Sequence, residues 1–150
     1  MGFMPKPPAH PRLAPDLLER VQAKFARWPV IEGLGLEVLE LRAGWAKVRL
    51  PLSPRVLNGT RGNMNGGWIA NLADIACAFA LSTHFDGTMP FATSDLHTRY
   101  LEPAMEALEA EAAVVRKSRN SAVMECRMYC GSVMVAFATA HFAIRPRLKG

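Results

Sequence analysis

One long apolar segment constrains the fold of this chain more than any other feature. Residues 65–85 place apolar side chains in two neighbouring stripes at helical spacing: Trp68, Leu72, Ile75 and Phe79, and beside them Ile69, Ala73, Ala76 and Ala80. A helix that is apolar around most of its circumference needs cover on most sides. Asn71, Asp74 and His84 interrupt the segment, which favours a buried helix over a membrane span. We therefore expect one central helix from Asn65 or Gly66 to about Phe85.

Six shorter runs have the composition and alternation of β-strands. They cover residues 36–41, 45–50, 92–100, 108–117, 122–130 and 133–144. The first run changes its apolar face between Val38 and Leu39, which predicts a bulge. Short loops at Asn120 and Gly131 predict hairpins, so the last strands should be antiparallel neighbours. Residues 133–144 are apolar on both faces, which predicts an interior strand and a second subunit stacked against the sheet.

The order of these elements predicts an α+β fold in which a curved antiparallel sheet wraps one long helix. Before the strands, apolar residues 13–25 recur at helical spacing and Pro29 should end that helix, which we expect to cover the core. Residues 1–12 are rich in proline and predict a mobile arm, leaving residues 13–150 as a single domain.

The cysteines and the charge set limits on function. Cys77, Cys126 and Cys130 are odd in number and form no CxxC pair, which favours a reducing cytoplasm over a disulfide framework or a zinc site. No phosphate-binding glycine loop, metal cluster or nucleotide fingerprint is found in the sequence. The net charge is +5, with basic residues gathered near residues 116–119 and 145–149. We expect no metal, cofactor, nucleic acid or membrane partner.

Asp74 is the first candidate for chemistry. It lies between Ala73 and Ile75 in the apolar helix, where a carboxylate loses hydration that only a partner or a proton can replace. An aspartate bonded to backbone across a polar gap is the plain alternative. Gly66 and Gly67 begin the same helix, where unsatisfied N–H groups and the helix dipole favour an oxyanion. A glycine pair that only permits a tight turn is the plain alternative there.

The spacing of these two features predicts a shared site. Eight residues separate Gly66 from Asp74, which is about 12 Å along a helix. A base and an oxyanion donor must both lie ~3 Å from the reacting atoms. If both serve one site, one subunit supplies Gly66 and its partner supplies Asp74, so catalysis would require a homodimer.

Three stretches resemble a known family in order and spacing: GNMNGGWIANLADIACAFA, FATSDLHTRYLEPA and EAEAAVVRKSRNSAVMECRM. The chain is identified on these residues as resembling the hotdog-fold acyl-CoA thioesterases of the phenylacetate-pathway (PaaI-like) type, within the 4-hydroxybenzoyl-CoA thioesterase superfamily. The resemblance implies a hotdog fold, hydrolysis of an acyl-CoA thioester, and a homodimer that pairs into a dimer of dimers.

The resemblance also assigns roles by position. It makes Asp74 the general base or nucleophile, Gly66 the oxyanion donor, and Thr93 a hydroxyl that helps to hold the attacking water. Asn58 and Gly67 are expected at the substrate, although the loop after Asn58 is one residue longer than in relatives. Asn65 is the clearest departure, because many relatives have histidine there and asparagine cannot carry a proton at neutral pH.

The basic run Arg116, Lys117 and Arg119 has two interpretations. The resemblance makes it the contact for CoA phosphates, whereas charge alone suggests a solvated turn. Three other functions stay open. A binding module of the same fold would hold acyl-CoA without turnover, with Asn65 as its support. A basic nucleic-acid binder lacks interleaved aromatic residues. A nucleophilic pair of Cys77 with a histidine is conceivable, although packing explains a cysteine on an alanine-rich helix.

Overall fold

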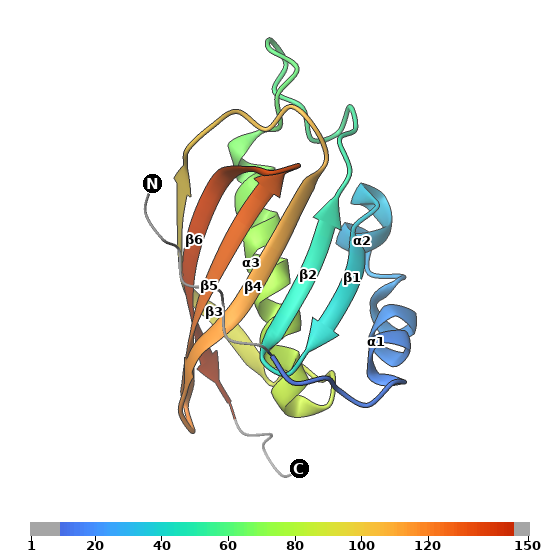
Figure 1. Ribbon diagram of the computed structural model, residues 1–150, viewed down its shortest axis with the longest axis vertical. Coiled ribbons are helices and arrows are strands. Elements are labelled where there is room, and N and C mark those ends of the chain that lie inside the picture. The colour runs from blue at the N-terminus through green and yellow to red at the C-terminus, as the bar shows by residue number, and fades with distance from the viewer. Residues whose placement is uncertain (1–9, 146–150) are drawn as a thin grey trace.

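The computed structural model describes residues 10–145, and these form two short helices, a curved sheet and one long helix (Figure 1). The helices are α1 (Leu17–Phe25), α2 (Pro29–Leu34) and α3 (Gly66–Ser82), which a 3-10 turn, η1 (Thr83–Phe85), extends. The strands are β1 (Glu37–Arg42), β2 (Trp45–Leu50), β3 (Phe91–Tyr100), β4 (Leu108–Lys117), β5 (Ser121–Cys130) and β6 (Val133–Ile144). Each predicted strand is therefore confirmed, and each of its two ends agrees with the structure to within one residue.

The six strands form a single antiparallel sheet in the order β1-β2-β4-β5-β6-β3, and α3 lies against one of its faces (Figure 1). Alternate residues of each central strand are buried under α3, including Val48 of β2 and Met124 and Met128 of β5. Leu72 and Phe79 supply much of the helix side of this core. This is the α+β hotdog arrangement that the sequence predicts.

Several local predictions are confirmed. The register between β1 and β2 shifts between Val38 and Glu40, at the predicted bulge. The turns at Asn120 and Gly131 join β4 to β5 and β5 to β6 as antiparallel neighbours. β6 lies between β5 and β3, which explains why a strand in the interior of the sheet tolerates apolar residues on both faces.

The N-terminal region departs from the prediction at one point. Pro29 does not simply end the first helix, because it occupies the first turn of α2, where proline is well tolerated. His10 and Pro11 belong to the predicted mobile arm, yet both bond to Ala43 in the turn between β1 and β2. These two residues make hydrogen bonds to the folded domain, and residues 1–9 of the predicted arm lie outside the described part of the chain, so the mobile arm stays a prediction.

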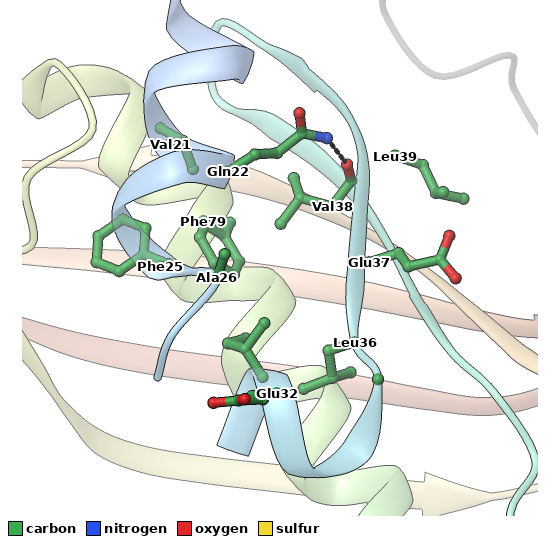
Figure 2. Close-up of a pocket in the computed structure, with 12 residues that line it drawn as sticks. Val21, Gln22, Phe25, Ala26, Glu32, Leu36, Glu37, Val38, Leu39 and Phe79 are labelled. Atoms are coloured by element: carbon green, nitrogen blue, oxygen red, sulfur yellow. Dashed lines mark hydrogen bonds between the residues drawn. The ribbon is translucent and has the colours of Figure 1, made fainter. Parts of the chain in front are cut away.

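The helices α1 and α2 cover the β1 end of the sheet (Figure 1). Phe25 of α1 packs edge-on against Phe79 of α3, with ring centroids 5.5 Å apart. Between α1, α2 and β1 lies a groove of about 600 Å³, where the Gln22 side chain donates a 2.7 Å hydrogen bond to the Val38 carbonyl (Figure 2). The helix α1 therefore covers the core, as predicted, and reaches the outer edge of β1.

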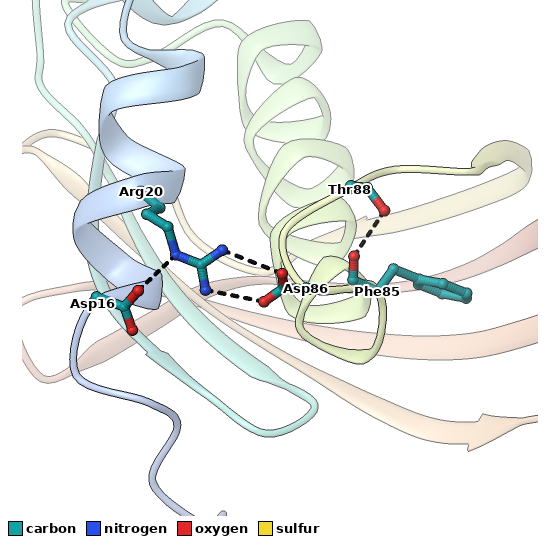
Figure 3. Close-up of polar contacts among 5 residues, drawn as sticks. All are labelled: Asp16, Arg20, Phe85, Asp86 and Thr88. Carbon is teal, nitrogen blue, oxygen red and sulfur yellow. Dashed lines mark hydrogen bonds and ion pairs between the residues drawn. The ribbon is translucent and has the colours of Figure 1, made fainter.

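A second contact fixes α1 to the loop that follows η1. Arg20 donates two hydrogen bonds to the carboxylate of Asp86, at 3.0 and 3.2 Å, and also pairs with Asp16 (Figure 3). The neighbouring Gly87 has a φ of +79°, and a Cβ there would lie 2.9 Å from Val21. Glycine is needed at this position both for its backbone conformation and for the close approach of α1.

Two surfaces differ from expectation in their polarity. The outward face of the sheet is less apolar than predicted, because it carries charged pairs such as Lys47 with Glu109 at 3.2 Å. On α3, the stripe formed by Gly67, Asn71, Asp74 and Ala78 is half-buried or exposed, as are its neighbours Trp68, Ala70 and Ile75, whereas the opposite face is buried. The helix is therefore left open along one side in the single chain. No helix among the described residues is long and apolar enough to cross a membrane.

Candidate active site

The first group of predicted site residues gathers at the beginning of α3. Asn65 is the N-cap residue, and its side-chain oxygen accepts a 2.8 Å hydrogen bond from the Gly67 N–H. Its amide nitrogen donates to the side-chain oxygen of Asn58 at 3.0 Å. Asparagine is among the favoured N-cap residues because it satisfies an orphan backbone donor. Asn65 thus has a clear structural task, and the Gly67 N–H is already occupied by it.

The Gly66 N–H has a different environment from that of Gly67. It makes no hydrogen bond with any other described residue. It is the first N–H of a helix of 17 residues, so the positive end of the helix dipole lies at this group. A pocket of about 310 Å³ adjoins it, lined by Asn58, Ile69, Tyr100 and Ala104 among others. The first turn of α3 can therefore present one donor to an oxyanion in a pocket.

Asp74 and Thr93 form the second group. The Thr93 hydroxyl, on β3, donates a 2.6 Å hydrogen bond to one carboxylate oxygen of Asp74. The sequence suggests a buried carboxylate at Asp74. In the structure this side chain is only half-buried, because it lies on the open stripe of α3. A carboxylate held by one short bond keeps its second oxygen available to accept a proton.

These two groups lie at opposite ends of β3 within one chain. Tyr100, the last residue of β3, donates its hydroxyl to the Gly66 carbonyl at 2.7 Å, whereas Thr93 near the start of the strand holds Asp74. Seven residues of a strand span roughly 23 Å. The chain therefore does not bring Gly66 and Asp74 together by itself, in agreement with the estimate from their spacing along the helix.

The basic run forms a third group, at the hairpin between β4 and β5. Arg116, Lys117 and Arg119 are all exposed. The Lys117 ammonium lies 5.3 Å from the ring of Phe85, so this hairpin is near the C-terminal end of α3 and the start of β3. Burial, with a smaller effect of Lys117, lowers the pKa of the adjacent His84 below its ordinary value. The hairpin is thus on the Asp74 side of the subunit.

The cysteines have the environment of packing residues. Cys77 and Cys126 are fully buried between α3 and β5, and all three cysteines are free thiols. A hydrogen bond with Cys77, together with burial, raises the pKa of the Cys126 thiol well above its ordinary value. A thiol held in its protonated form is a poor nucleophile. These contacts favour packing over the alternative of a nucleophilic cysteine.

Sequence reasoning missed Tyr100 as a site residue. Tyr100 lies at the end of β3, on the strand face that carries the half-buried Leu96 and Thr98 and turns toward α3. An aromatic residue at the end of such a strand was the available signal, but its contact with Gly66 depends on how β3 crosses the helix. The 600 Å³ groove is larger than the pocket beside Gly66, yet it lies against α1 and β1 and contains none of the predicted site residues.

A long apolar helix lies against a curved six-stranded antiparallel sheet, and this arrangement defines the class of hotdog proteins. Comparison with known proteins agrees. The family model described as "Thioesterase superfamily" matches residues 61–137, more than half of the chain. The chain belongs to this superfamily, has the hotdog fold, and is similar to PaaI proteins.

Comparisons with individual relatives agree with this assignment to the superfamily. A solved variant of the phenylacetic acid degradation protein PaaI from Thermus thermophilus is 29% identical, with a TM-score of 0.71, over 78% of this chain and 99% of that one. The E. coli PaaI protein, at 20% identity, shows the fold alone, with a TM-score of 0.77 over 87% of this chain and 94% of that one. A curated relative from Halobacterium salinarum, provisionally named an esterase, is 29% identical over 116 residues, 75% of this chain and 77% of the relative. The family and these names support a hydrolase.

Proposed function

We propose that this protein hydrolyses acyl-CoA thioesters to a free acid and CoA. The observation that carries the proposal is the short hydrogen bond between Thr93 and Asp74, on the one side of the central helix that its own chain leaves open. A carboxylate oriented in this way, in a family of thioesterases, suits the activation of water or direct attack on a thioester carbonyl.

The proposed chemistry uses two groups at the reacting carbonyl. As general base, Asp74 takes a proton from water while the water oxygen bonds to the carbonyl carbon, and the negative charge moves to the carbonyl oxygen. The Gly66 N–H donates to that oxygen, aided by the helix dipole. The tetrahedral intermediate then expels the CoA sulfur, which leaves with the proton. As nucleophile, Asp74 would instead bond to the carbonyl carbon and displace CoA as its thiolate, and water would then cleave the resulting mixed anhydride to the free acid, regenerate the Asp74 carboxylate and supply the proton for the CoA thiol. The reaction draws on no metal or cofactor.

A homodimer formed by two β3 strands would unite the separated halves of this site. β3 is an edge strand of ten residues, and most of its side chains are exposed. Unpaired backbone groups on such an edge favour pairing with another strand. If two copies pair antiparallel, the Tyr100 end of one β3 meets the Thr93 end of the other. Gly66 of one subunit would then approach the partner's Asp74.

The charges on β3 favour one register for this pair. Asp95, His97 and Arg99 alternate on the face of the strand directed away from α3. When His97 lies opposite the partner's His97, each Asp95 faces the partner's Arg99, and the ion pair occurs twice. In this register Tyr100 lies near the partner's Ser94 and Thr93, at the bulge that β3 has between Thr93 and Asp95. Charge complementarity and completion of the site therefore select the same register.

The remaining expectations complete the proposal. The exposed Arg116, Lys117 and Arg119 would contact the phosphates of CoA, for which guanidinium groups and ammonium groups are well suited. Pairing of two dimers into a dimer of dimers stays a prediction. The outward face of the sheet, which would meet the second dimer, carries charged side chains. A reducing cytoplasm is the proposed location, supported by three cysteines that all remain free thiols.

Release of free thiol from short, medium, long and aromatic acyl-CoAs tests the proposal, with the native protein beside Asp74→Asn. Removing a catalytic carboxylate should lower kcat by about 100-fold or more while the protein still folds and binds CoA esters. Asp86→Asn is the matched control, because this aspartate lies at the surface near α1. Turnover by Asp74→Asn at the native rate would contradict the assigned role.

A binding protein of the same fold is the second candidate, and Asn65 favours it. Asn65 is occupied as a helix cap and cannot take part in proton transfer at neutral pH. Binding of CoA esters without turnover of any member of the panel would establish this function instead. Conversion of Asn65 to histidine would then test whether that residue limits the activity.

A further inference from the structure

Tyr100 stands out as an exposed residue with an ordered contact. Its side chain is 53% exposed, yet its hydroxyl donates a 2.7 Å hydrogen bond to the Gly66 carbonyl. A Cβ on Gly66 would lie 3.3 Å from two carbons of the Tyr100 ring, so the ring packs directly on the glycine. The strand β3 thus holds the first residue of α3 by both a polar and an apolar contact.

The first turn of α3 is held internally by the Asn65 carbonyl, which accepts hydrogen bonds from the N–H groups of Trp68 and Ile69 at 3.0 and 3.2 Å. Gly66 and Gly67 have no side chains, and glycine loses the most conformational freedom when it is ordered. The Asn65 cap fixes the Gly67 N–H, but it makes no bond with the Gly66 N–H. The helix bonds set the plane of the Gly66 N–H relative to α3, whereas Tyr100 contacts Gly66 itself and holds this turn against β3 and the pocket.

The same ring forms a wall of the 310 Å³ pocket that adjoins Gly66. A thioester carbonyl that reaches the Gly66 N–H from this pocket would pass beside the tyrosine. An oxyanion donor is effective when its position is fixed before charge develops, because no reorganisation is then needed in the transition state. A residue that holds the donor in place should consequently affect the chemical step more than substrate binding.

We propose that Tyr100 is a positioning residue of the hydrolytic site. Through its hydroxyl on the Gly66 carbonyl and its ring on the Gly66 Cα, it fixes the first turn of α3 so that the Gly66 N–H meets the oxyanion. The inference rests on the proposed thioester hydrolysis. A purely structural role, as a contact between β3 and α3, would lower stability and leave kcat unchanged.

Tyr100→Phe tests this directly, because it removes the hydroxyl and keeps the ring. The loss of one positioning hydrogen bond should lower kcat on the order of tenfold, with KM within about twofold of native. Tyr100→Ala should lower kcat further. Tyr129→Phe is the matched control, since Tyr129 is the only other tyrosine in the chain and lies on β5, away from Gly66. Thermal unfolding verifies that each variant is folded.

A binding experiment separates positioning from a general disturbance. A trifluoromethyl ketone analogue of an acyl-CoA presents an oxyanion to the site, whereas the thioether analogue presents none. Tyr100→Phe should weaken binding of the ketone by the same factor as it lowers kcat, and leave binding of the thioether unchanged. Native kcat in folded Tyr100→Phe, or equal weakening of both analogues, overturns the inference. Absence of turnover by the native protein would instead contradict the proposed hydrolysis.

Discussion

The two edge strands of the sheet differ in how far helices cover them. At the β1 edge, α1 and α2 pack alongside the strand, a bulge interrupts its register, and Gln22 takes up the Val38 carbonyl. At the β3 edge, ten residues run without a proline or a lysine, and no described helix covers their outer side. Covers and bulges are the devices by which natural proteins prevent an edge from pairing.

This difference indicates which edge of the sheet is expected to pair with a second subunit. The strand β3 also has a bulge, between Thr93 and Asp95, so helix cover and not regularity distinguishes the two edges. A chain that covers one edge with helices and leaves the other long and uncovered has one edge suited to a second strand. The open edge also carries both halves of the candidate site, with Thr93 near its start and Tyr100 at its end. We therefore expect changes on β3 to act on assembly and activity together, and changes at the β1 edge to act on stability alone.

Reversal of one charge on β3 should have the largest effect. Asp95→Arg places a second cation opposite the partner's Arg99, and like charges across an interface cost several kcal/mol. We expect the dimer dissociation constant to rise by roughly 100-fold or more, with a parallel loss of thioesterase activity. Sedimentation velocity across a concentration series, together with thiol release, measures both.

The reciprocal exchange is the decisive control for this prediction. Asp95→Arg combined with Arg99→Asp restores complementary charges and should recover both the dimer and the activity. Glu37→Arg tests the other edge, because Glu37 pairs with Arg49 at 3.3 Å on β1 and β2. The comparison of edges would fail if Glu37→Arg dissociated the dimer or if the exchange did not restore it.

Truncation of Phe25 should have a large effect that is confined to stability. The residue is only 3% exposed, and its ring lies 4.2 Å from that of Trp28 and 5.5 Å from that of Phe79, measured between centroids. Phe25→Ala should therefore reduce the free energy of unfolding by about 3 kcal/mol or more, measured by urea denaturation. The folded variant should keep the native dimer constant and kcat, and Phe25→Leu should show a smaller loss. Dissociation of folded Phe25→Ala would show that the two edges are not independent.

The ion pair between Arg20 and Asp86 should have the smallest effect, and it should depend on pH. The hydrogen bond from Arg20 lowers the pKa of Asp86 below its ordinary value of 3.8. A depressed carboxyl pKa adds stability above the unfolded value, and that stability is lost as the pH falls through the folded value. The Tm of the native protein should therefore slightly exceed that of Asp86→Asn at pH 7, and the difference should shrink as the pH falls below 3.8 and vanish once Asp86 is protonated in the folded protein.

Salt gives an independent check on that small effect. Both groups are at the surface, so screening should reduce the Tm difference between native protein and Asp86→Asn at high ionic strength. A difference that persists in strong acid and in high salt would assign the role of Asp86 to the loop backbone instead of the ion pair.

Much of the fold could be predicted because its elements have strong local patterns. The apolar stripes of residues 65–85 identify α3, and strict alternation identifies strands such as β2 and β5. The pairing of β3 with β6 could not be predicted in this way, because hairpin reasoning reaches only strands joined by a short turn. Pro29 was misread for a related reason, since proline at a helix start and after a helix end looks alike in sequence.

The candidate site divides along the same line. The motifs around Asp74, Gly66 and Thr93 were enough to predict these three as site residues. Asn65 was singled out because many relatives have histidine at this position. Its actual contacts with Gly67 and Asn58 are local and agree with ordinary capping. Tyr100 and the half-exposed setting of Asp74 could not be predicted, because both depend on the crossing of β3 over α3. The types of residue at the site could therefore be predicted from the sequence, but the long-range packing of β3 on α3 could not.

The position of β3 in the sheet also affects the order of events during synthesis. β3 leaves the ribosome before β4, β5 and β6, yet among the described strands it pairs only with β6, the last of them. Its backbone therefore stays unpaired within the subunit until β6 has been synthesised, when closure of this long loop becomes possible. Thr93 is placed beside Asp74 only in this final step. A chain truncated before β6 would consequently have no fixed carboxylate and two unsatisfied edges on β3, which makes it a target for aggregation.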